Sequence, residues 1–253
     1  SFGTEKPGQV HFLFVGNKNE LFNFFTKIKT KLIISCEDIT ANMKKRGGGI
    51  VLLELLDKTM DIENYYQINA DFETADSMGA NFINSCLEKF SKTLVTEYNS
   101  EPRFNGNNLE IIMSILSNYS PDCKVIAEVE CEIDDLIDKD ITDSSLFAKK
   151  FKTAVEIAKK DIPRAVTHNK GIMNGVDSVL IATGNDFRAV EACAHSYASK
   201  DGKYKSLTHV EISTNKFRYW IELPISIGTV GGLTNLHPLV NWSLKLLGLS
   251  LIH

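Results

Sequence analysis

The sequence predicts an α+β protein with two domains, and three observations support this fold class. Its 253 residues are enough for one large domain or two smaller ones. In the first half, segments with a strand-like alternation of apolar residues are interspersed with segments of helical periodicity. The turn residues of "NYSPDCK" (118–124) then precede a new strand pattern, which indicates a domain boundary near residue 120.

The first half follows the order β-α-β-β-α-β. Strands are expected at 9–15, 49–58, 64–73 and 108–118, and helices at 19–33 and about 77–98. This order is the split motif of ferredoxin-like domains, in which two helices cover one face of an antiparallel sheet. The second half begins with a strand in "KVIAEVECEI". The elements expected after it are a helix at 144–160, a strand at 178–184, a helix at 187–200 and an edge strand at 217–225.

Composition narrows the class of protein. Hydrophobic residues make up 43% and charged residues 24%, as in ordinary globular proteins. A net charge of −4 provides no cationic excess for a phosphate backbone, so we expect no nucleic acid partner. No apolar run has the length of a membrane helix, and no secretion signal is visible. The five cysteines and the histidines lack metal-ligand spacing, so we expect no metal. These features predict a cytoplasmic enzyme or binding protein.

The stretch "DSMGAN" (76–81) is the first candidate binding site. It lies where a predicted strand gives way to the long helix, and a helix start with small residues attracts anions such as a pyrophosphate. Asp76 or Ser77 is equally suited to an ordinary N-cap. The spacing is not G-x-G-x-x-G, so it does not predict a Rossmann fold.

The stretch "KKRGGGI" (44–50) is the second candidate. Lys44, Lys45 and Arg46 stand beside three glycines at the entrance to a strand, where cations suit the extra phosphate of a nucleotide. A flexible, solvated turn explains the same residues. Both interpretations stay open from the sequence alone.

Lys170 and Asp186 form the third candidate. Lys170 lies in "THNKGIMNG", and Asp186 ends "IATGND", interpreted as a short strand followed by a helix. If the chain folds back after Lys170, the two side chains lie on neighbouring segments, and the carboxylate keeps the ammonium charged. The alternatives are a solvent-facing lysine and an aspartate that only caps the following helix.

The segment "RAVTHNKGIMNGVDSVLIATGNDFRAVEACAHSYA" (164–198), with "DSMGAN" before it and "GTVGGLTNLHP" (228–238) after it, resembles 3-hydroxy-3-methylglutaryl-coenzyme A (HMG-CoA) reductases of the soluble bacterial class II type. The resemblance implies a small ferredoxin-like NAD(P)-binding domain, residues 5–120, inserted in a larger α/β substrate-binding domain. Residues 121–253 would be only part of that larger domain. It also implies an oxidoreductase of the mevalonate pathway in isoprenoid biosynthesis, which converts HMG-CoA to mevalonate and coenzyme A with two hydrides from NAD(P)H.

The resemblance assigns roles to individual residues. Lys170 becomes the catalytic lysine, which stabilises the oxyanion formed when hydride reaches the thioester carbon, and Asp186 becomes the residue that tunes it. Arg164 and Asn174 match positions that contact the hydroxymethylglutaryl group. The cofactor contacts implied by the resemblance are Asp76, Met78, Gly79, Ala80, Asn81 and Asn118. Ser77 departs from the alanine usual in this motif.

Cofactor and partners follow from the same resemblance. Because "TANMKKRGGG" offers cations and no carboxylate, we expect NADPH rather than NADH. The family works as a homodimer, so a second copy is an expected partner. The expected ligands are HMG-CoA, mevalonate and coenzyme A, and no membrane is expected.

Two family segments have no match here. A catalytic glutamate from an "ENVIG"-like segment is expected before residue 1, and a histidine from a "GHM"-like helix after His253. Our hypothesis is that the chain is part of a longer polypeptide and is inactive alone. The alternatives are a non-catalytic fragment or degenerate relative that binds nucleotide or acyl-CoA, and a Schiff-base role for Lys170.

Overall fold

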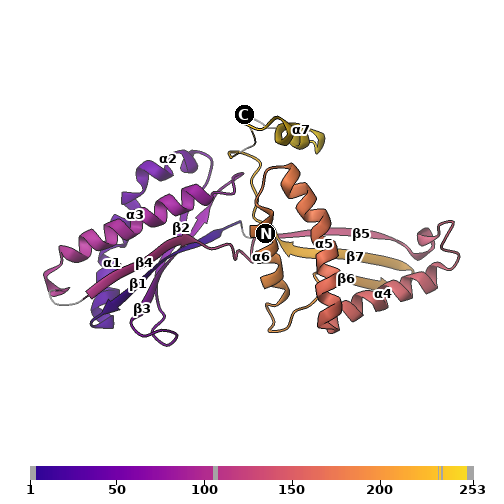
Figure 1. Ribbon diagram of the computed structural model, residues 1–253, viewed down its shortest axis with the longest axis horizontal. Helices are drawn as coiled ribbons and strands as arrows, with labels where there is room; N and C mark the ends of the chain where they lie inside the picture. Colours follow the sequence, from indigo (N-terminus) through magenta and orange to yellow (C-terminus); the bar gives the residue numbers. More distant parts are fainter. Residues whose placement is uncertain (1–3, 105–107, 233, 235, 250–253) are drawn as a thin grey trace. The chain divides into compact units, whose positions relative to one another are not determined.

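The computed structural model describes residues 4–104, 108–232, 234 and 236–249. The chain divides into two compact units, with the division between Ser120 and Pro121. Figure 1 shows a four-stranded sheet with its helices in the first unit and a three-stranded sheet with its helices in the second. No helix in the described part of the chain combines the length and apolar character needed to cross a membrane.

The first unit contains the β-α-β-β-α-β order predicted from the sequence, with one added helix. Its main elements are β1 (Lys6–Val15), α1 (Lys18–Ser35), α2 (Glu37–Lys45), β2 (Gly49–Asp57), β3 (Tyr65–Glu73), α3 (Ala80–Asn99) and β4 (Asn108–Leu116), with a 3₁₀ turn at Pro102–Phe104. The strands lie in the order β2-β3-β1-β4, and every neighbouring pair is antiparallel.

The core of this unit lies between the sheet and the helices. Alternate residues of β1 and β3 are buried, and they pack against Leu21, Ile28 and Phe90 on the inner faces of α1 and α3. Burial of such side chains contributes about 1.5–3 kcal/mol each. The alternation therefore fixes which face of each strand meets the helices.

The added helix α2 was not expected from the sequence. Cys36 stands at the junction of α1 and α2, where the chain changes direction. Acidic residues lie in the first turn of α2, and Lys44 and Lys45 lie in its last turn, so both ends match the helix dipole. Two of the predicted cofactor-binding cations are therefore helical and exposed, rather than part of a flexible turn.

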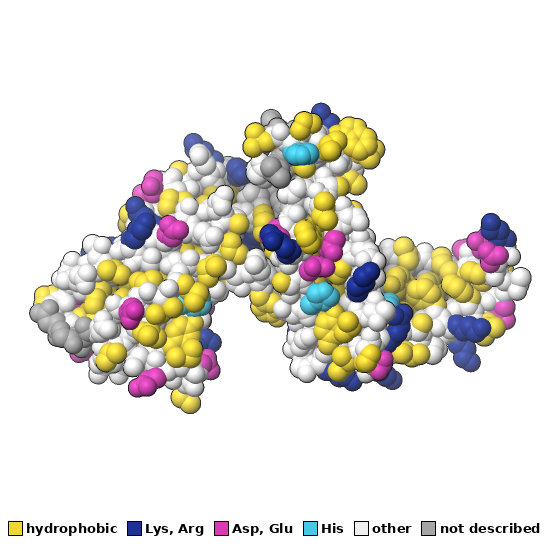
Figure 2. Space-filling view, viewed as in Figure 1, with side chains coloured by type: hydrophobic (Ala, Val, Ile, Leu, Met, Phe, Trp, Pro, Cys, Tyr) yellow, Lys and Arg dark blue, Asp and Glu magenta, His cyan; other side chains and the backbone are white. Residues whose placement is uncertain are grey.

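The second unit consists of β5 (Lys124–Glu132), a 3₁₀ turn (Ile133–Leu136), α4 (Ser144–Lys160), α5 (Ile162–Ala182), α6 (Phe187–Ala198), β6 (Thr208–Ser213), β7 (Lys216–Pro224) and α7 (Pro238–Leu246). Its sheet has the order β5-β7-β6 and is antiparallel. In Figure 2, hydrophobic side chains gather around α7, where Leu239, Trp242 and Leu246 are all more than 60% exposed.

Two expectations for this unit are wrong. The strand expected at 178–184 is instead the last part of α5, up to Ala182, and the turn that follows. Helix packing buries Met173 and Leu180 and carries the helix through Gly171 and Gly175. The edge strand expected at 217–225 is β7, the centre of the sheet, because β6 pairs along its second side.

Candidate functional site

The turn between β3 and α3 has a fixed shape. Ala75 and Gly79 both adopt left-handed backbone conformations, with φ of 48° and 80°. The Ser77 hydroxyl and amide both donate to the Thr74 carbonyl, at 2.8 and 3.1 Å. The Ala75 amide donates to the Glu73 carboxylate at 2.8 Å. The turn is thus held by its own hydrogen bonds on both sides of the strained residue Ala75.

Gly79 is the N-cap residue of α3, and it has no side chain to satisfy the first turn of the helix. The amides of Ala80, Asn81 and Phe82 have no acceptor within the helix. Asp76 and Ser77, expected as possible caps, do not cap it. A helix start with free amides and a positive dipole end favours an anionic ligand.

Lys6 lies beneath this turn and was not among the residues expected from the sequence. Its side chain is buried, and its Nζ donates to Thr74 Oγ1 at 2.6 Å and to the Ser77 carbonyl at 2.8 Å. The alternation of the β1 sequence already indicated that this lysine is buried. Lys6 is in phase with Gly8, Val10 and the other inward-facing residues of β1, a position where lysine is rare.

The predicted cofactor residues lie at one end of the four-stranded sheet. Gly49 of β2 pairs with Glu73 of β3, which places the end of α2 beside the turn, and Arg46 lies 4.0 Å from the Asp76 carboxylate. At the same sheet end, the Ser117 amide donates to the Pro7 carbonyl. Asn118 is the next residue, so it also lies at this end of the sheet. Three strand spacings, about 14 Å, separate β2 from β4.

Arg164, Lys170 and Asn174 lie along α5, and all three are exposed. On the same helix, Gly171 and Gly175 directly follow Lys170 and Asn174, and neither has an atom within 4 Å of where a Cβ would be. The opposite face is fixed by Asn169, which is fully buried, donates to the Lys205 carbonyl at 2.9 Å and accepts from the Leu207 amide at 3.1 Å. The backbone of Lys170 is therefore held while its side chain is exposed.

Asp186 is the N-cap of α6. Its Oδ1 accepts from the amides of Arg188 and Ala189 at 3.1 and 3.3 Å, and it lies 3.5 Å from Arg188 Nε. The neighbouring Asn185 accepts from the Gly228 amide at 2.9 Å, which joins "ATGND" to the glycine-rich "GTVGG" segment. Leu233 and Asn235, which follow in "GTVGGLTNLHP" (228–238), lie outside the described residues.

Two histidines of the second unit, His168 and His209, have packing roles. His168 lies 2.7 Å from Thr208 Oγ1, and burial, aided by the charge of Arg164, lowers its pKa. His209 stacks on Trp220, and burial lowers its pKa too. Within the described part of the chain, no group of three or more histidine, cysteine or acidic side chains is placed to hold a metal ion.

Comparison with known proteins decides the family. The family model described as hydroxymethylglutaryl-coenzyme A reductase matches residues 5–252. The chain belongs to the HMG-CoA reductase family.

Similar reductases occur in bacteria and archaea. The chain is 31% identical over 239 residues to a probable HMG-CoA reductase of Borreliella burgdorferi, covering 94% of this chain and 52% of that protein. It is 32% identical over 251 residues to the HMG-CoA reductase of Archaeoglobus fulgidus, covering 98% and 53%. The chain thus spans about half the length of these reductases.

Solved reductase structures share the fold. The class II HMG-CoA reductase of Streptococcus pneumoniae, in a structure described as bound to NADPH in open conformations, matches with a TM-score of 0.81 and 32% identity. The match covers 97% of this chain and 57% of that one. A second structure of the reductase from the same organism gives the same score and covers 64% of its chain.

The pairing of Lys170 with Asp186, expected from the reductase motifs, is absent within this chain. Among the described residues, no ion pair or hydrogen bond joins the two side chains. Twelve residues of helix separate Lys170 from the end of α5 at Ala182, a rise of about 18 Å. The expected pairing required the chain to fold back after Lys170. Helix α5 instead continues without a break through this residue.

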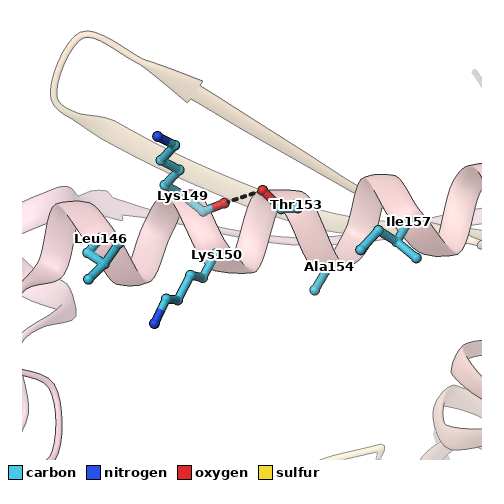
Figure 3. A pocket seen from close by; sticks show the side chains of 6 residues that line it. All are labelled: Leu146, Lys149, Lys150, Thr153, Ala154 and Ile157. Atoms are coloured by element: carbon cyan, nitrogen blue, oxygen red, sulfur yellow. Dashed lines mark hydrogen bonds between the residues drawn. The ribbon is translucent and has the colours of Figure 1, made fainter.

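The open hollow along α4 does not belong to the reductase motifs. Figure 3 shows that its lining comes from one helix, with Leu146, Ala154 and Ile157 as the apolar part and Lys149 and Lys150 beside them. Its volume is about 290 Å³. None of the predicted site residues lines it.

Proposed function

We propose that this chain forms the nucleotide-binding part and a portion of the substrate-binding part of an enzyme that reduces HMG-CoA to mevalonate and coenzyme A. The observation that carries the proposal is the turn at residues 74–79, with its uncapped helix start, in a chain of the reductase family. In this proposal the first unit is a ferredoxin-like domain inserted in a larger substrate domain.

The cofactor side suits NADPH. The pyrophosphate would lie at the uncapped start of α3, where the amides of Ala80 and Asn81 are free to donate. Lys44, Lys45 and Arg46 are exposed at the same sheet end and would hold the 2′-phosphate. The S. pneumoniae relative, described as bound to NADPH, supports this choice. Each NADPH would supply one hydride, so the two-hydride reduction would consume two cofactor molecules in turn.

On the substrate side, Lys170 would stabilise the oxyanion that forms on the thioester carbonyl as hydride arrives. A preorganised ammonium lowers the energy of that charge most in the transition state. Arg164 and Asn174 lie on the same exposed half of α5 and would orient the hydroxymethylglutaryl group. The bare surface at Gly171 and Gly175 leaves room for a substrate to approach this helix.

Asp186 would meet Lys170 only between two copies of the chain. The length of α5 separates the two residues within one copy, so we propose a homodimer in which each copy supplies one of them. Mixing Lys170→Met copies with Asp186→Asn copies should then restore activity in the mixed dimers that combine two intact residues. No restoration would show that the residues act within one copy or separately.

The proposed enzyme works in the cytoplasm. All five cysteines are free thiols, as expected in a reducing compartment.

The test of function follows the absorbance of reduced nicotinamide in the presence of HMG-CoA. We expect NADPH consumption and release of free coenzyme A from a polypeptide of the relatives' full length. The 253-residue chain should bind NADPH whether or not it catalyses the reduction of HMG-CoA. Binding without turnover in both proteins would favour the alternative of a non-catalytic nucleotide- or acyl-CoA-binding protein. Faster turnover with NADH than with NADPH would overturn the cofactor choice.

A further inference from the structure

We propose that Lys6 is a positioning residue for the dinucleotide pyrophosphate, because it holds the turn at residues 74–79 in the shape that receives it. The inference rests on the proposed nucleotide function of the first unit. Lys6 does not need to touch the cofactor. Its effect passes through Thr74 and Ser77 to the start of α3.

Lys6 joins the beginning of the turn to its middle. Its Nζ contacts the side chain of Thr74, at the beginning, and the carbonyl of Ser77, three residues later. The Thr74 hydroxyl also donates to the Ser77 carbonyl, at 2.7 Å. Short hydrogen bonds join the three groups to one another inside the turn. An ammonium donor makes such bonds stronger than a neutral donor does.

Thr74 transmits this constraint to the helix start. A Cβ placed on Gly79 would lie 2.3 Å from the methyl carbon of Thr74, so Thr74 and Gly79 are in close contact. Gly79 in turn accepts the first helical hydrogen bond of α3, from the Ile83 amide at 2.9 Å. A shift of Thr74 would therefore change the direction of the amides that follow Gly79.

The charge of Lys6 also suits an anion site. Lys6 is 8% exposed, so little solvent screens its charge. A buried ammonium is costly unless polar groups surround it, and the oxygens of Thr74 and Ser77 meet part of that need. The cation adds positive potential on the same side as the dipole end of α3.

The experiment titrates the 253-residue chain with NADPH and, separately, with inorganic pyrophosphate, and follows the backbone amide resonances of Gly79, Ala80 and Asn81. In the wild-type chain both probes should shift these resonances. In Lys6→Met, we expect about tenfold weaker binding of both probes, as for loss of a charged hydrogen bond. Resonances of the sheet, such as those of Val10 and Phe12, should stay in place.

Two variants keep the test decisive. Thr74→Val retains Lys6 and the side-chain shape but removes the hydroxyl, so it should also weaken binding even if Lys6→Met fails to fold. Lys31→Met is the matched control, because it removes an exposed lysine whose partner, Glu97, lies at the far end of α3. It should bind both probes like the wild-type chain.

The outcomes separate the two proposals. Wild-type binding that is unchanged in a folded Lys6→Met chain overturns the inference about Lys6 and leaves the nucleotide function intact. If Lys6→Met does not fold, unchanged binding by Thr74→Val overturns the inference. A wild-type chain that binds neither probe overturns the proposed nucleotide function and, with it, the role of Lys6.

Discussion

The Thr74 side chain occupies the space beside the α-carbon of Gly79, so any side chain at residue 79 would meet it. The contact lies inside a turn whose backbone is already left-handed at Gly79. Two separate costs, conformational and steric, therefore bear on a substitution at this position.

We predict that Gly79→Ala destabilises the first unit. The left-handed conformation costs a non-glycine residue about 1–2 kcal/mol, and the clash with Thr74 adds to it. Urea unfolding followed by circular dichroism measures the loss. Gly47→Ala is the matched control, since Gly47 also has positive φ but no neighbour within 4 Å. Equal losses in the two variants would show that the contact with Thr74 carries no cost.

The cations at the end of α2 should decide the choice between NADPH and NADH. Replacing Lys44, Lys45 and Arg46 together by glutamine should weaken NADPH binding by tenfold or more, on the order of one charged hydrogen bond, and leave NADH binding nearly unchanged. Fluorescence titration of the reduced nicotinamide measures both. Replacing Lys149, Lys150 and Lys152 on α4 together by glutamine removes the same total charge and is the matched control. A parallel loss for both cofactors would contradict this role.

Lys170→Met should separate binding from chemistry. In the active reductase, we expect turnover to fall by about a hundredfold to a thousandfold, because an oxyanion donor is lost. HMG-CoA binding, measured by calorimetry, should change little. The melting temperature should also stay the same, since Lys170 is exposed. Near-normal turnover would refute the catalytic assignment.

Asp186 has a capping role that can be measured without turnover. Asp186→Ala should lower the stability of the second unit by about 1 kcal/mol through loss of the helix N-cap. Asp186→Asn should retain the cap and most of the stability while it removes the charge. Chemical denaturation compares the two. If asparagine destabilises as much as alanine, the charge rather than the cap stabilises α6.

His168 should make the second unit less stable in acid. Its pKa lies below the ordinary value of 6.5 because burial disfavours the charged ring. The unfolded chain therefore binds more protons than the native chain in the interval between the two pKa values. The contribution of neutral His168 to the free energy of unfolding is fully present above pH 6.5, and it falls as the pH drops through that interval. His168→Gln should flatten this part of the curve relative to the wild-type chain, and an unchanged slope would exclude His168 as the cause.

The sheet of the first unit could be predicted because burial in β1 and β3 follows the sequence alternation. Val10, Phe12 and Phe14 of β1 are all buried, whereas His11 and Leu13 between them are only partly buried. The turn at residues 74–79 was also predictable, because a motif of small residues stood between a strand and a long helix. Its two hydrogen bonds from Lys6 were not, since Lys6 lies nearly seventy residues earlier in the sequence.

The wrong prediction of a strand at residues 178–184 has a physical cause. "SVLIATG" is a short apolar run between glycines, and such a run suits a buried strand or a buried helix equally. Gly171 and Gly175 each cost a helix about 1 kcal/mol, which suggested a break before the run. Packing of Met173 and Leu180 against α6 overrides that preference. The fold of α5, and hence the separation of Lys170 from Asp186, depends on tertiary contacts.

The position of the three cations has an evolutionary consequence. Lys44 and Lys45 lie on the exposed last turn of α2, and Arg46 follows it, outside the ladder that joins β2 to β3. Mutations there can exchange charge without disturbing the sheet, whereas Lys6, Thr74 and Gly79 are interlocked and tolerate little variation. In the proposed role of these cations, coenzyme preference can therefore change through substitutions that leave the sheet intact.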